Sequence, residues 1–148
     1  MKRYLCLFLI LCMVPACSFA VFGSDYLEDL DIYAELFDIP TVSTCPKKTV
    51  DGMTVFITNG GYVGVDESAG NVNGFSVCGE GDSFLVYSLA AICILEDAND
   101  AFISNVGTVT SAYLMCRFTK EEYANITSCG TVFLIKPYEN KYMFVINR

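Results

Sequence analysis

Histidine and tryptophan are absent from this 148-residue sequence, and basic residues are scarce. The lack of histidine removes the most common general base, the usual partner of a serine or cysteine nucleophile, and the usual ligand of zinc, copper or iron. Nine Lys and Arg residues are outnumbered by seventeen Asp and Glu residues, which gives a formal net charge of −8. Because such a surface repels nucleic acids and anionic lipid headgroups, we expect neither as a partner.

The cysteines of this sequence form no recognisable redox, zinc or disulfide motif. The cysteines beyond the first twenty residues are Cys45, Cys78, Cys93, Cys116 and Cys129. Their spacing matches neither a zinc site nor a Cys-x-x-Cys pair, and an odd number leaves at least one thiol unpaired. We expect Cys93 and Cys116, which have apolar neighbours, to act as small hydrophobic side chains. One disulfide among the other three is the alternative.

The run Glu96-Asp97-Ala98-Asn99-Asp100 offers closely spaced oxygen donors. It does not match a calcium-binding EF-hand loop, because the fifth position counted from Asp97 is Ala101. Helix capping by Asp97 or Asn99 explains these residues more simply. We expect no metal site and no other cofactor.

The first twenty residues have the three parts of a secretory signal, namely the basic pair Lys2-Arg3, the apolar run 4–14 and small residues before a cut. We expect cleavage after Ala20, which leaves a signal peptide (1–20) and one domain (21–148) long enough for a single core. An alternative exists, because residues 14–17 loosely resemble a lipobox in which Cys17 becomes lipidated and anchors the protein in the cell envelope. With either outcome we expect the mature chain to work outside the cytoplasm.

The apolar segment 83–95 is the expected centre of the fold. Between Phe84 and Leu95 only Ser88 is neither apolar nor aromatic, so no side of a helix here is suited to water. Twelve helical residues reach about 18 Å, well short of the ~30 Å membrane interior, and acidic residues follow at once. We therefore predict a buried helix, with Asp82 or Ser83 as its cap, and no transmembrane segment in the mature chain.

Apolar periodicity predicts two more helices. Tyr26, Leu30, Tyr33 and Phe37 form one stripe of an amphipathic helix that Ser24 caps and Pro40 ends. A second stripe runs from Phe102 to Cys116, and the short link before it predicts an antiparallel helical hairpin with the central helix. Gly107 within this stripe indicates either a close helix crossing or a tolerated glycine.

Strand patterns occupy the rest of the chain. Residues 54–58, 62–66 and 72–78 predict a three-stranded meander, whose first turn is Asn59-Gly60-Gly61. Residues 124–129, 131–136 and 142–147 predict two or three further strands, and the last hairpin is apolar on both faces, so we expect it inside the sheet. Residues 41–51 have no helical or strand periodicity of apolar residues, and we predict a connector there. The sequence thus predicts an α+β fold, in which a helical hairpin and an N-terminal amphipathic helix cover an antiparallel sheet made of a meander and a C-terminal hairpin.

No motif specifies a reaction. The carboxylates best placed for an acid/base pair are Asp66-Glu67 with Glu80 or Asp82, and they lie in predicted turns, where acidic residues commonly serve as caps. We expect a non-catalytic binding or interaction domain with an extracellular or cell-envelope partner. A carboxylate-based hydrolase is the alternative, and it requires these side chains to converge in one cleft.

Tyr62 and Tyr138 are the candidate binding residues. Both lie at predicted turns, where recognition residues are common and where an amphipathic ring makes contacts at low entropic cost.

Four segments also allow a comparison with known exported proteins. They are VPACSFA at 14–20, the acidic DLDIYA at 29–34, the apolar FLVYSLAA at 84–91 and the closing aromatic hairpin. In this layout the chain resembles small exported proteins of anaerobic Gram-positive bacteria. The resemblance implies export and a compact α+β domain, and it implies no activity and no site residue.

Overall fold

The structure, a computed structural model, describes residues 26–68 and 70–148. The expected signal peptide, the alternative lipid site at Cys17 and the expected cap at Ser24 lie outside these residues. In chain order the elements are α2 (Tyr26–Leu36), β1 (Lys47–Val50), β2 (Met53–Thr58), β3 (Gly61–Ser68), β4 (Asn71–Gly79), α3 (Gly81–Glu96), α4 (Ala101–Thr119), β5 (Tyr123–Ile126), β6 (Val132–Tyr138) and β7 (Lys141–Asn147).

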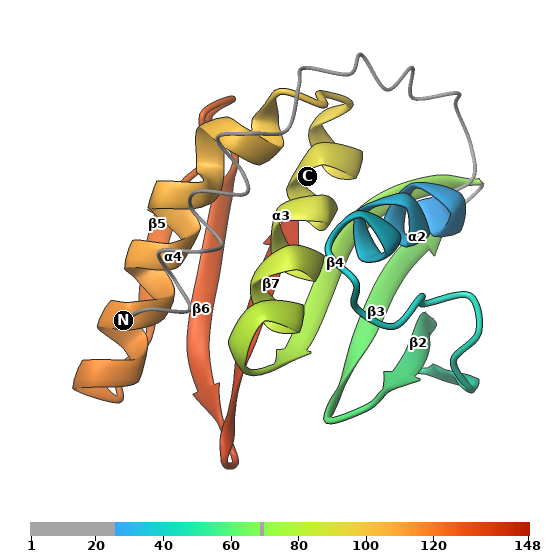
Figure 1. The fold of residues 1–148 in the computed structure, drawn as a ribbon, viewed down its shortest axis with the longest axis horizontal. Helices are drawn as coiled ribbons and strands as arrows, with labels where there is room; N and C mark the ends of the chain where they lie inside the picture. Colours follow the sequence, from blue (N-terminus) through green and yellow to red (C-terminus); the bar gives the residue numbers. More distant parts are fainter. Residues whose placement is uncertain (1–25, 69) are drawn as a thin grey trace.

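These elements form two layers, as the α+β prediction requires. The seven strands make one sheet in the order β1-β2-β3-β4-β7-β6-β5, and every neighbouring pair is antiparallel. Figure 1 shows α2, α3 and α4 on one face of this sheet. The helical hairpin of α3 and α4 and the N-terminal helix therefore cover a single face, which confirms the predicted fold class.

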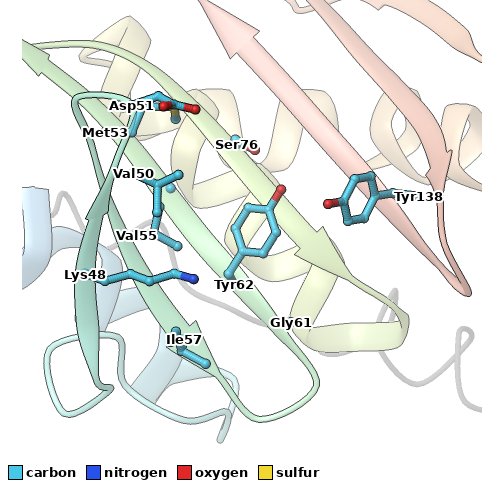
Figure 2. Close-up of a pocket in the computed structure, with 11 residues that line it drawn as sticks. Lys48, Val50, Asp51, Met53, Val55, Ile57, Gly61, Tyr62, Ser76 and Tyr138 are labelled. Atoms are coloured by element: carbon cyan, nitrogen blue, oxygen red, sulfur yellow. The ribbon is translucent and has the colours of Figure 1, made fainter.

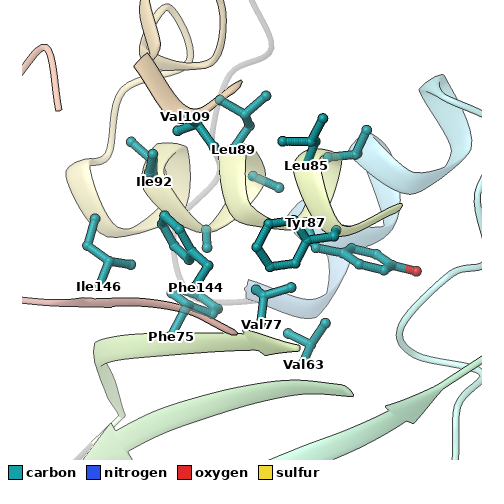
Figure 3. Packing of buried hydrophobic residues seen from close by; sticks show 14 of the residues in the cluster. Val63, Phe75, Val77, Leu85, Tyr87, Leu89, Ile92, Val109, Phe144 and Ile146 are labelled. Atoms are coloured by element: carbon teal, nitrogen blue, oxygen red, sulfur yellow. The ribbon is translucent and has the colours of Figure 1, made fainter. Parts of the chain in front are cut away.

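Helix α3 is the buried centre of the domain. It contacts α2, α4, β4 and β7, and Ala90, Ala91 and Ile92 are fully inaccessible to solvent. Figure 3 shows its side chains packed between Val109 of α4 and the apolar face of the sheet. The helix begins at Gly81 after the N-cap Glu80, so the prediction of Asp82 or Ser83 as cap was wrong by two residues.

The last strand, β7, lies inside the sheet between β4 and β6. Phe144 and Ile146 point into the core, whereas Met143 and Val145 alternate onto the opposite face. This position accounts for the apolar residues on both faces of the strand and confirms the prediction made from them.

One part of the predicted layout was wrong, and one open alternative is resolved. Residues 47–50, predicted to be part of a connector, form edge strand β1, so the meander has four strands. Gly107 is exposed, and a side chain there would meet nothing within 4 Å, so the glycine is tolerated on an open helix face and marks no close crossing.

All five described cysteines are free thiols. Cys93 and Cys116 are buried in the apolar core, as predicted. Cys129 is exposed, and the disulfide considered for the remaining three is not formed in the structure.

Candidate functional site

The sheet face that carries no helix is the main exposed feature of the fold, and we call it the open face. Side chains alternate between the faces of a strand, so the register defines this surface. One row crosses all seven strands and consists of Lys48, Val55, Gly64, Ser76, Val145, Leu134 and Ala124. A second row consists of Ile57, Tyr62, Cys78, Met143 and Lys136. The centre of both rows is uncharged.

A hollow of about 400 Å³ lies on the β1–β4 side of the open face. Its floor forms where two small residues, Gly64 of β3 and Ser76 of β4, face each other. Its apolar lining comes from Val50, Met53, Val55 and Ile57 on the first two strands. A Cβ atom at Gly64 would lie 3.2 Å from Cε of Met53, so the missing side chain is what leaves room there.

Tyr62 and Tyr138, the two residues predicted for binding, both line this hollow. Tyr62 is the second residue of β3 and Tyr138 is the last residue of β6, and β4 and β7 lie between these strands. In Figure 2 the ring of Tyr138 extends toward Tyr62, with its hydroxyl group on the side of that residue. The structure therefore brings the two tyrosines together, although they are far apart in the sequence.

The Tyr62 hydroxyl is partly buried, and its proton is directed at the sulfur of Met143, 3.9 Å away. Burial raises the pKa of Tyr62 above its ordinary value, while the nearby Ser76 hydroxyl acts in the opposite direction. Tyr62 is thus a neutral hydroxyl at physiological pH. Tyr138 is 41% exposed and can meet a ligand directly.

Charged groups lie at the margins of the open face. Lys48 and Asp51 line the hollow from β1 and from the turn that follows it. Lys136 and Lys141 lie on the same face at the β6–β7 end, because they pair with Met143 and Tyr138. An apolar centre with tyrosine and methionine, surrounded by charged groups, is the composition found in protein binding surfaces.

The carboxylates considered for a hydrolase do not converge. Asp66 pairs with Gly74 near the β3–β4 turn, whereas Glu80 and Asp82 follow the far end of β4. Six residues of extended chain separate Gly74 from Glu80, a span of about 20 Å. None of these carboxylates lines the hollow. The paired site that the hydrolase alternative requires is therefore not formed.

Sequence reasoning missed Lys48, Asp51 and the small residues that make the floor. Lys48 and Asp51 were assigned to a connector, and the meeting of Gly64 with Ser76 depends on the register between strands. An isolated glycine inside a strand pattern was the available signal, since it often marks a close approach or a gap.

Within the described residues, no group of three or more Cys, Asp or Glu side chains is arranged to hold a metal ion. Among the helices found in residues 26–68 and 70–148, none is long and apolar enough to cross a membrane.

Comparison with known proteins gives no match to a protein-family model, to a curated protein or to a solved structure.

Proposed function

We propose that this protein is an exported binding domain whose binding surface is the open face, centred on the hollow beside Tyr62 and Tyr138. The observation that carries the proposal is the convergence of these two tyrosines on one apolar hollow of about 400 Å³. This volume lies within the range of ligand-binding pockets, which are mostly apolar with a few polar groups that fix orientation.

The chemistry of the lining supports recognition of a ligand or partner surface. Four apolar side chains supply contact area, and the hydroxyl groups of Tyr62, Tyr138 and Ser76 are available for hydrogen bonds with a ligand. Tyrosine offers a large, rigid contact area at low entropic cost, which makes it effective at such sites. The helices occupy only the other face of the sheet, so nothing in the described fold competes for this surface.

Affinity capture tests the proposal. The purified chain from Val21 onward is immobilised and exposed to culture medium and to a cell-envelope extract. We expect saturable retention of a partner, and we expect Tyr62→Ala/Tyr138→Ala to reduce it at least tenfold. Phe118→Ala is the matched control, because Phe118 is 89% exposed, more than any other aromatic residue that the structure describes, and lies on α4, in the helix layer.

A second variant separates the hollow from the tyrosines. Gly64→Val places a branched side chain in the floor of the hollow without altering either ring, and the strand conformation accepts a β-branched residue. We expect this variant to remain folded and to lose retention. Equal retention by wild type, the double tyrosine variant and Gly64→Val would contradict the proposal.

A further inference from the structure

The open face has the size and composition of an interface that stays covered in solution. Ten large apolar side chains are exposed among the described residues, and five of them lie on the open face, namely Val50, Ile57, Ile126, Val132 and Tyr138. Val132 is 60% exposed and Ile126 is 56% exposed. Antiparallel sheets with one solvated face normally alternate apolar and polar residues, and this face departs from that rule.

We propose that the occupant of the open face is a second copy of this chain, stacked sheet against sheet as a two-fold dimer. This inference rests on the proposed function, because it names the partner of the same surface. Symmetric dimers with self-complementary faces are the most common soluble oligomers.

The area of the face fits a dimer. Besides the two rows described above, the open face has a third row that includes Asp66, Gly74 and Asn147. Seven strands span about 29 Å from the first strand axis to the last, and three rows of side chains, each about 6.7 Å deep, cover about 20 Å along the strands. Two copies would therefore cover roughly 600 Å² each, or about 1,200 Å² together, which exceeds the ~1,000 Å² expected of a biological interface.

Shape and charge favour a second copy over an unrelated surface. Two identical sheets carry the same twist, which allows aligned packing with the sheets about 10 Å apart. The acidic residues of α2, which include Glu28, Asp31 and Glu35, lie in the helix layer. Stacking through the open faces keeps these acidic helices on the outside of the pair, where repulsion between two negatively charged chains is weakest.

Sedimentation equilibrium of the chain from Val21 onward tests this inference. All residues of the described core lie between Leu30 and Ile146, so this chain retains the core. The average molecular mass is measured at protein concentrations from about 1 μM to about 200 μM. We expect it to rise with concentration to twice the mass of one chain. A single-chain mass throughout would overturn the dimer, while capture of another partner through Tyr62 and Tyr138 would still support the proposed function.

Two sets of variants locate the interface. Ile57→Lys/Val132→Lys adds two charges to the open face at positions that are 45% and 60% exposed, so the lone chain tolerates them. We expect the dimer Kd to rise by roughly 100-fold or more, because burying these charges against an apolar partner is costly. Leu114→Lys/Phe118→Lys on α4, at 45% and 89% exposure, is the matched control and leaves the dimer intact. A dimer broken by the α4 variant, or untouched by the open-face variant, would overturn the assignment. Circular dichroism confirms that each variant is folded.

Discussion

Replacing Ala91 by aspartate tests the claim that α3 is enclosed on every side. Ala91 is fully inaccessible, and the residues before and after it, Ala90 and Ile92, are equally buried. A carboxylate at this position has no water and no basic partner, so the folded state accepts it only in the neutral form.

The cost follows from this protonation. Holding an aspartate with an ordinary pKa of about 3.9 in its neutral form at pH 7 costs about 4 kcal/mol, at 1.36 kcal/mol per pH unit. The extra atoms add about 1–3 kcal/mol of overpacking. The sum of about 5–7 kcal/mol is comparable with the whole stability of a domain, about 5–15 kcal/mol.

Urea unfolding of Ala91→Asp and Ala91→Asn between pH 7 and pH 4 measures this cost. The folded aspartate has a raised pKa, so its penalty is largest at neutral pH and decreases as the pH falls toward the unfolded pKa. The asparagine variant has nearly the same shape and does not titrate, so its penalty stays constant. An unchanged free energy of unfolding for the aspartate variant, or the same pH dependence for both variants, would refute the burial of α3.

Three further outcomes are expected. Gly74→Ala lowers the free energy of unfolding by about 1–3 kcal/mol, because its Cβ would lie 2.8 Å from the backbone oxygen of Ile146, which cannot move away without disturbing β7. Gly64→Ala is nearly neutral, because the closest atom, at 3.2 Å, is the flexible end of Met53. Equal free energies of unfolding for the two variants would contradict this contrast. Burial raises the pKa of Cys93 to about 12. As the pH rises above about 9, the unfolded state therefore loses this proton first and the free energy of unfolding falls. Cys93→Ala weakens that fall in urea titrations under reducing conditions, and an unchanged pH dependence of the free energy of unfolding would show that the thiol plays no part. Thr127→Val removes the hydroxyl that donates to the Glu96 carboxylate and lowers the free energy of unfolding by about 1–3 kcal/mol. If Glu96→Gln costs nothing in the same unfolding assay, this hydrogen bond does not stabilise the fold.

The order of helices and strands could be predicted because its signals are local. The run from Phe84 to Leu95 has no polar side, and burial follows directly from that composition. Alternation of Phe144 and Ile146 with Met143 and Val145 likewise indicated an interior strand, and β7 is one.

Strand β1 was missed because its side chains are all exposed, which leaves no pattern of burial to detect. It is held instead by backbone pairing with β2, an interaction that side-chain periodicity does not report. Lysine at an edge strand is also a common protection against aggregation, and it resembles a loop composition.

The candidate site depends on contacts between distant segments. Tyr62 and Tyr138 were chosen as separate residues at turns, and only the pairing of β4 with β7 places them beside one hollow. The floor of the hollow requires Gly64 to pair with Ser76, a register that the sequence of either strand does not specify.

NMR mapping of methyl resonances tests directly whether the open face is the binding surface. Spectra of the methyl-labelled chain are recorded with and without the fraction that it retains from culture medium or envelope extract, and as a function of its own concentration. We expect shifts at Val50, Ile57 and Val132 on the open face and constant signals at Ile103 and Leu114 on α4. Shifts confined to the α4 methyl groups would contradict it.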